Sequence, residues 1–210
     1  MEKASAMELA TQQIALAKIY TNKKLRMQFF ADPLTAGHEL KLKPKDVDLL
    51  SGLSSKQVHL FARSLHRKRM NYICRLLPLT SLALEDQFHG LFFRYIESRN
   101  PNGSKWPLED AIMFSEFLLT KACDDLKYSW VMDLLHYETA SLKAASGKSR
   151  FLIRKFSFQV QLLAKNFLLN NEIPKLFYRP CFAFWFRLSK KGPMLHKVFS
   201  LPSLMNFQSN

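Results

Sequence analysis

The apolar residues of this chain change their spacing part-way along it, and this change most limits the folds that the chain can adopt. Up to about residue 146 they recur every three or four residues, which is typical of amphipathic α-helices. From Cys181 to Leu188 they alternate, as in a strand with one set of side chains on each side. One side carries Phe182, Phe184, Phe186 and Leu188, and the other carries Ala183, Trp185 and Arg187. We therefore predict a mainly α protein of the α+β class, with a helical-bundle body at 1–146 and a small C-terminal module with a β-hairpin at 147–210.

Capping residues and prolines mark where the predicted helices begin and end. Asn22 is placed to cap a short helix that runs through Phe30. Asp32 stands before Pro33, and a proline suits the first position of the next helix. The other predicted helices are one ending near Tyr20, a short one from Pro44, a long one from Ser54 to Pro78, one around Phe88–Ile96, one from Pro107 to about Ala122 and one from about Tyr128 to Ala144.

The C-terminal part is predicted to contain a β-hairpin. The alternating segment is followed by a turn-forming run from Ser189 to Pro193, and Leu195–Leu201 can pair back on it. Phe156–Val160 also alternates, although the leucines that follow fit a helical turn equally well. The edge of a two-stranded hairpin can accept an added strand, so we place a binding edge at Cys181–Leu188 or at Leu195–Leu201.

Positive charge is concentrated in the C-terminal part. The chain carries 31 Lys and Arg against 17 Asp and Glu, a net charge of +14. Residues 147–210 hold 11 of these cations, a single acid (Glu172) and 12 of the 27 aromatic residues. Cations among rings suit an acidic protein partner, stacked nucleic-acid bases or an anionic membrane surface. The predicted partner-binding residues are Phe182, Phe184, Trp185, Arg187, Lys190, Lys191 and Lys197.

A second basic region lies on the long predicted helix. Its cations are Arg63, Arg67, Lys68, Arg69 and Arg75, and residues 55–84 contain no Asp or Glu. Such a helix can lie along phosphates, in which case binding weakens steeply with salt. The same residues also fit an ordinary solvated helix face.

Several classes of protein are not indicated by the sequence. The longest apolar run, Cys181–Phe186, is far shorter than the ~20 residues of a membrane helix, and no signal peptide is recognised. The cysteines form no CxxC pair, and no motif of a known catalytic class is found. Asp86 and His89 make one i, i+3 pair, whereas a di-iron bundle needs two. We therefore predict a cytoplasmic protein with no transmembrane segment and no catalytic, cofactor-binding or metal-binding residues.

Glu138 is expected to be partly buried. It lies near the apolar side of its predicted helix, which carries Trp130 and Leu134. A buried carboxylate is costly unless it is paired. We therefore predict a structural ion pair with an arginine such as Arg94 or Arg154, and a role as catalytic acid is the second interpretation.

Three stretches of the chain resemble a bacterial family labelled as a DNA-binding domain. The first, Lys68–Thr80 followed by Phe88–Tyr95, is similar to its Arg-rich helix, Leu/Phe-Pro-x-Thr break and Phe-rich helix ending in Tyr. The second, Asp133–Ala140, is similar to its Asp-x-x-x-x-Glu-x-Ala helix. The third, Phe156–Val160 with Phe182–Arg187, resembles its C-terminal strands.

The resemblance implies a protein partner. Some relatives in that family are partner subunits of multinuclear-iron oxidases that modify peptides, as in methanobactin biosynthesis, where the partner helps to hold the precursor peptide. An iron-containing oxidase and a peptide are therefore the partners that the resemblance implies. Residues 1–55 lie outside the pattern, and their Ala17–Asn22 and Phe29–Pro33 stretches together look like the small helical lead of some ring-opening dioxygenase subunits.

Two classes of function fit these observations. The first is a non-catalytic adaptor that binds a peptide or partner enzyme through its basic C-terminal module. The second is a nucleic-acid-binding regulatory protein, although no helix-turn-helix glycine turn and no RNA-binding aromatic motif is recognised. We expect the first.

Overall fold

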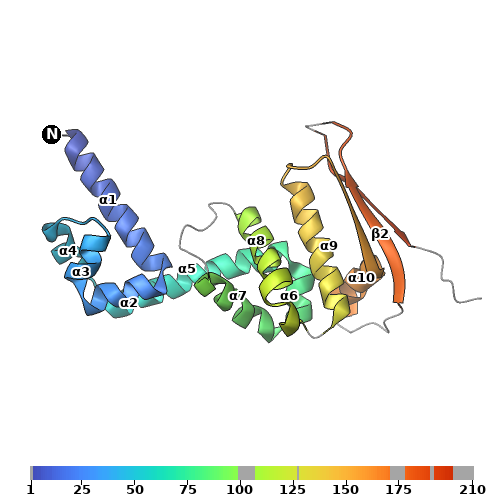
Figure 1. Ribbon diagram of the computed structural model, residues 1–210, viewed down its shortest axis with the longest axis horizontal. Helices are drawn as coiled ribbons and strands as arrows, with labels where there is room; N and C mark the ends of the chain where they lie inside the picture. The colour runs from blue at the N-terminus through green and yellow to red at the C-terminus, as the bar shows by residue number, and fades with distance from the viewer. Residues whose placement is uncertain (1, 99–106, 127, 171–177, 190–191, 201–210) are drawn as a thin grey trace, which may run out of the picture. The chain divides into compact units, whose positions relative to one another are not determined.

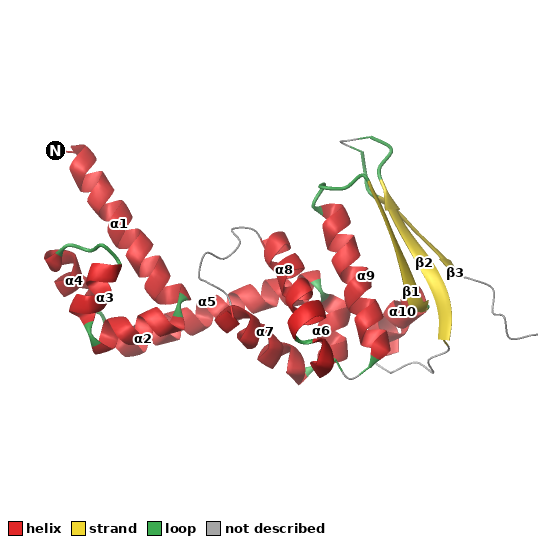
Figure 2. Cartoon of the chain, in the orientation of Figure 1, coloured by secondary structure: helices red, strands yellow, loops and turns green. Residues whose placement is uncertain are grey.

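The part of the protein that the structure describes consists of helices and one small antiparallel sheet near the C-terminus (Figure 1, Figure 2). The structure, a computed structural model, describes residues 2–98, 107–126, 128–170, 178–189 and 192–200. The elements are α1 (Glu2–Thr21), α2 (Lys23–Ala31), α3 (Pro33–Glu39), α4 (Pro44–Ser51), α5 (Ser55–Leu76), α6 (Pro78–Leu84), α7 (Asp86–Ser98), α8 (Pro107–Lys121), the 3-10 turn η1 (Cys123–Asp125), α9 (Ser129–Ala145), β1 (Phe151–Phe158), α10 (Val160–Asn170), β2 (Tyr178–Phe186) and β3 (Leu195–Ser200). The predicted fold class, a helical body with a small β module, is confirmed.

The helix ends follow the capping residues of the sequence. The side-chain oxygen of Asn22 accepts a hydrogen bond from the N–H of Leu25 at 3.1 Å, in the first turn of α2. The carboxylate of Asp32 accepts one from the N–H of Thr35 at 3.2 Å, in the first turn of α3. Each side chain satisfies an N–H group that has no partner inside its own helix. Both predicted caps are therefore confirmed.

The chain divides into two compact units, and the division falls inside α5. The described residues 2–69 belong to the first unit, and residues 70–98 and 107–200 belong to the second. We predicted the division at 146/147 instead. The sheet belongs to the second unit because Phe156 and Trp185 pack in one cluster with Ala140 and Ala144 of α9. The change of composition at 147 therefore marks the approach to the sheet rather than the boundary between the two units.

In the first unit, α1 to α4 and the first part of α5 surround a small apolar cluster. Its buried members are Ala15, Ile19, Phe29, Ala36, Leu40, Leu50 and Val58. Arg26 is also buried, and its Nη1 donates to the carbonyl oxygens of Ile19 and Tyr20 at 3.0 and 3.1 Å. The guanidinium thereby satisfies carbonyl groups at the end of α1 that lack intrahelical partners.

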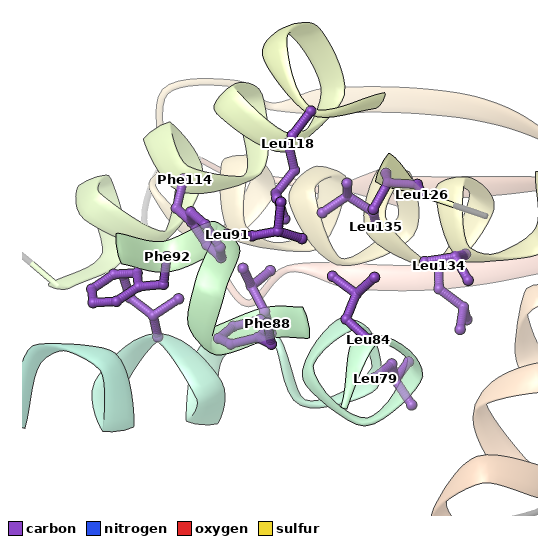
Figure 3. Packing of buried hydrophobic residues seen from close by; sticks show 14 of the residues in the cluster. Leu79, Leu84, Phe88, Leu91, Phe92, Phe114, Leu118, Leu126, Leu134 and Leu135 are labelled. Atoms are coloured by element: carbon purple, nitrogen blue, oxygen red, sulfur yellow. The ribbon is translucent and has the colours of Figure 1, made fainter. Parts of the chain in front are cut away.

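In the second unit, the core gathers side chains from α6, α7, α8 and α9 (Figure 3). The rings of Phe88 and Phe92 on α7 meet that of Phe114 on α8 edge to face, with centroids 5.3 and 5.5 Å apart. Leu134 and Leu135 of α9 are fully buried in the same cluster. Burial of such side chains is the main favourable contribution to folding. The core therefore fixes the position of α9, on which the sheet packs.

The sheet has three described strands in the order β1-β2-β3. Across it, Ile153 of β1 lies opposite Phe184 of β2, which lies opposite Lys197 of β3. The predicted pairing of the last two strands is confirmed. The predicted binding edge at Cys181–Leu188 is wrong, because β2 is the central strand and has a partner on each side.

One face of the sheet packs against α9. Figure 1 shows α9 running along the strands. Cys181, Ala183 and Trp185 alternate along β2 and are all buried on this side. Ala140 and Ala144 of α9 belong to the same cluster, and their small side chains let helix and sheet approach closely. The predicted alternation of β2 is thus confirmed.

Candidate functional site

The opposite face of the sheet carries nine side chains in a regular grid, which we call the outward face. Successive side chains of a strand point to opposite sides, so the residues between those that face α9 must point away from it. The register of the three strands aligns these residues in rows across the sheet. The outward face consists of Phe151, Ile153 and Lys155 of β1, Phe182, Phe184 and Phe186 of β2, and Leu195, Lys197 and Phe199 of β3.

The outward face exposes large apolar side chains. Phe151 is 61% exposed and Phe199 is 57% exposed. The ring of Phe184 lies between them, with its centroid 6.4 Å from that of Phe151 and 5.5 Å from that of Phe199. A contiguous apolar patch on a protein surface is typical of a site that binds another molecule. The outward face is therefore the candidate functional surface of the second unit.

Two lysines add positive charge to the outward face. Lys155 and Lys197 are both exposed and lie on opposite edge strands of the described sheet. Lys155 lies across from Phe182, and Lys197 lies across from Phe184. No carboxylate within the described ranges forms an ion pair with either lysine. The surface thus suits a ligand that is partly apolar and partly anionic.

The two edge strands differ in how their backbone groups are used. The N–H groups of Ser157 and Phe158, at the end of β1, donate to Oδ2 of Asp133 on α9, at 2.7 and 2.9 Å. This carboxylate therefore occupies the backbone donors at the end of β1. Among the described strands, β3 has a partner only on its β2 side. β3 corresponds to the predicted edge at Leu195–Leu201, of which Leu201 lies outside the described residues.

Two of the predicted partner-binding residues lie on the α9 side instead. Trp185 is 3% exposed, and its ring centroid lies 5.7 Å from that of Tyr137 and 5.0 Å from that of His196. Nη2 of Arg187 donates to the carbonyl oxygen of Ala144 at 3.2 Å, near the end of α9. Both side chains therefore support the fold.

The other predicted partner-binding residues divide between the outward face and the undescribed part of the chain. The outward face contains Phe182, Phe184 and Lys197, whereas Lys190 and Lys191 lie outside the described residues. Sequence reasoning missed the contribution of β1, because the run Phe151–Ile153 is apolar throughout and hides its alternation. The pattern that could have found it is Phe151, Ile153 and Lys155 taken two residues apart.

The cations of the predicted basic helix lie on α5 but do not form one stripe. Arg63, Arg67, Lys68 and Arg75 are exposed, while Arg69 is half-buried and engaged by a neighbour. Arg63 and Arg67 lie about one turn apart on one side, whereas Lys68 and Arg75 lie about two turns apart on another. The four cations at positions 63, 67, 68 and 69 belong to the first compact unit, and Arg75 belongs to the second.

Glu138 is buried, at 5% exposure, and it binds the start of α6. Its Oε1 accepts a hydrogen bond from the N–H of Leu79 at 2.7 Å. Its Oε2 accepts from the N–H and the hydroxyl of Thr80, at 2.8 and 2.6 Å. The carboxylate therefore caps a helix that lies far away in the sequence.

The predicted ion pair of Glu138 with Arg94 or Arg154 is wrong. Nη1 of Arg94 instead pairs with Oδ2 of Asp125 at 2.6 Å, in an exposed position. The physical reason is that a helix N-terminus carries partial positive charge and N–H groups without partners, so it can replace a cation beside a buried carboxylate. Pro78 at the start of α6 is the one local sign of this N-terminus.

Burial raises the pKa of Glu138 to about 7, against the opposing effect of its hydrogen bonds from Thr80 and Leu79. All its hydrogen-bond partners given above belong to α6, so the geometry favours a structural role. In the described part of the chain, no three His, Cys, Asp or Glu side chains are grouped so that they could hold a metal ion.

No protein-family model matches this chain, and no curated protein is significantly similar to it. Among the described helices, none is both long enough and apolar enough to cross a membrane. The outward face and the edge of β3 are therefore the features of the described structure that bear on function.

Proposed function

We propose that this protein is an adaptor that binds an extended segment of a peptide or partner enzyme and catalyses no reaction itself. The observation that carries the proposal is the position of β3, an edge strand of the described sheet, beside the exposed rings of the outward face. The proposed partner is a peptide or a protein such as an iron-containing oxidase, which the sequence resemblance implies.

Strand addition at β3 would supply both affinity and selectivity. An extended segment that pairs with β3 gains main-chain hydrogen bonds from the edge. Its alternate side chains would contact Leu195 and Phe199, which are 38% and 57% exposed. Main-chain pairing releases no counterions, so this part of the affinity should persist when the salt concentration is raised.

The rest of the second unit supports β3 before any ligand arrives. β3 pairs with β2 along its length, and Ala183 and Trp185 of β2 are packed in one cluster with residues of α9. A binding edge that is already ordered loses less conformational entropy when it binds. This support favours strand addition over a site that must fold around its ligand.

Selection of peptides from a random linear library on the full-length protein tests the proposal. We expect the enriched peptides to lose binding when their amide nitrogens are methylated, because methylation removes the donors that a strand ladder needs. We also expect the bound peptide to slow hydrogen exchange of the backbone amides of residues 195–200. The proposal is overturned if no peptide is enriched, or if methylated and unmethylated peptides bind equally.

A nucleic-acid-binding regulatory protein is the second candidate, and the exposed rings beside lysines favour it. Bases can stack on rings such as those of Phe151 and Phe199, while Lys155 and Lys197 neutralise phosphates. Binding of a fluorescent oligothymidine would then fall steeply with salt. It would also weaken when both lysines are replaced by Gln.

A further inference from the structure

The outward residues of β3 follow an order that limits what can pair with this strand. Leu195, Lys197 and Phe199 lie two residues apart, so an apolar, a cationic and an apolar side chain follow one another along the edge. In an added strand, each outward side chain would stand directly beside one of these, with Cβ atoms about 4.5–5.5 Å apart. The edge therefore favours one type of side chain at each alternate position of the added strand.

We propose that the segment held by β3 is acidic at one outward position and apolar at the outward positions on either side. Its pattern is apolar-x-acidic-x-apolar, with the carboxylate beside Lys197 and the apolar residues beside Leu195 and Phe199. The pattern is the same in both directions, so it holds for a parallel and for an antiparallel guest. This inference rests on the proposed function, since it assumes strand addition at β3.

This region of the chain has almost no acidic residues, so the carboxylate beside Lys197 has to come from the bound segment. Lys197 is exposed and has no carboxylate partner among the residues that the structure describes. The whole segment 147–210 contains one acidic residue, Glu172, against 11 cations. Opposite charges directly across two strands attract each other, and like charges destabilise the pair. An acidic residue is therefore the complement that the edge lacks.

The same lysine disfavours a second copy of this chain as the occupant. In an antiparallel pair of β3 strands that matches Leu195 with Phe199, the two copies of Lys197 would stand opposite each other. Lysines on edge strands commonly prevent pairing between identical molecules. Lys197 would thus disfavour pairing with a second β3 and favour pairing with an acidic segment. This one residue would then determine the selectivity of the edge.

The test uses the full-length protein and a fluorescent peptide, Thr-Val-Thr-Glu-Thr-Val-Thr, with versions in which Gln or Lys replaces Glu. We expect the Glu peptide to bind about two- to fivefold more tightly than the Gln peptide, and the Lys peptide to bind most weakly. Lys197→Glu should reverse this order. Lys155→Glu is the matched control, because it makes the same charge change on the outward face but on the opposite edge strand, and it should leave the order unchanged.

Each other outcome has a definite meaning. The inference is overturned if Lys197→Glu leaves the order of the three peptide affinities unchanged. The placement of the site at β3 is overturned if Lys155→Glu reverses that order. If library peptides bind by strand pairing but none of the three defined peptides binds, the inference fails alone. A version of the Glu peptide with methylated backbone amide nitrogens tests strand pairing itself. If it binds as tightly as the unmethylated peptide, strand pairing is absent, so the proposed function fails and the inference fails with it. Thermal melts of both variants should match that of the wild type, because both lysines are exposed.

Discussion

Two carboxylates on α9 hold segments that lie far from them in the sequence. Oδ2 of Asp133 accepts the N–H groups of Ser157 and Phe158 at the end of β1. Glu138 accepts from the first turn of α6. At the scale of single residues, the second unit is therefore connected by acids that bind backbone N–H groups.

Replacing Glu138 with Ala should lower the free energy of unfolding by about 1–3 kcal/mol, because the N–H groups of Leu79 and Thr80 would stay buried without an acceptor. Urea denaturation of the variant and the wild type measures the difference. Arg94→Ala is the control, since its pair with Asp125 is exposed and is worth about 0–1 kcal/mol. Equal losses in the two variants would contradict the assignment.

The stability of the protein should also depend on pH through Glu138. Its folded-state pKa of about 7 lies above the ordinary value of 4.5. The folded state therefore binds this proton more readily than the unfolded state, and the free energy of unfolding should fall as pH rises from about 4.5 to about 7. Glu138→Gln removes the titrating group and should flatten this part of the curve. Denaturation across that pH range measures it, and an unchanged slope in the variant would show that another group is responsible.

At the scale of elements, β2 has a hydrogen-bonded strand on each side, so a proline in β2 would remove a hydrogen bond within the sheet. Ala183 is fully buried and has Arg154 on one side and Val198 on the other. Ala183→Pro should therefore destabilise the whole sheet, by on the order of 3 kcal/mol, rather than block a binding edge. Thermal melting checks this. Ala183→Gly keeps the N–H and should lose only about 1 kcal/mol, so equal losses in both variants would argue against a lost ladder bond.

The elements that could be predicted from the sequence are those whose signals are local. Asn22 and Asp32 are followed by their helices within a few residues, so pattern and structure agree. The seven-residue α6 could not be predicted, because the acceptor for its first turn stands on α9. The alternation at Phe156–Val160 proved to combine the end of β1 with the start of α10.

The candidate site was predictable only in part, for the same reason. Phe182 and Phe184 could be assigned to one face of the sheet because their strand alternates plainly, whereas Lys197 was selected for its charge and proves to lie on the same face. Which strand forms an edge depends on a third strand that pairs from a distance, and composition cannot reveal this. Trp185 was misassigned because a ring that packs on α9 and a ring that contacts a ligand look alike in a sequence.

At the scale of the whole molecule, the sheet and the helices of the second unit share a buried cluster, so we expect them to unfold together. Removing residues 147–210 would uncover Ala140 and Ala144 of α9 and would remove Val160 from their cluster. We therefore expect the 1–146 fragment to bind a dye that reports exposed apolar surface and to melt at a lower temperature than the full chain. A fragment that melts as the full chain does, with no dye binding, would support a boundary at 146/147.

The hydrogen bonds between Glu138 and α6 also lead to an expectation about the order in which these two helices form. The carboxylate lies 59 residues after Leu79 and 58 after Thr80. An isolated helix of seven residues is unstable in water, whereas the 17 residues of α9 can begin to form from local contacts. We therefore expect α6 to form only after α9, once the segment between them, which contains α7 and α8, has brought Glu138 to Leu79 and Thr80. The time at which the backbone amides of α6 become protected from hydrogen exchange during refolding would thus show when Glu138 reaches α6.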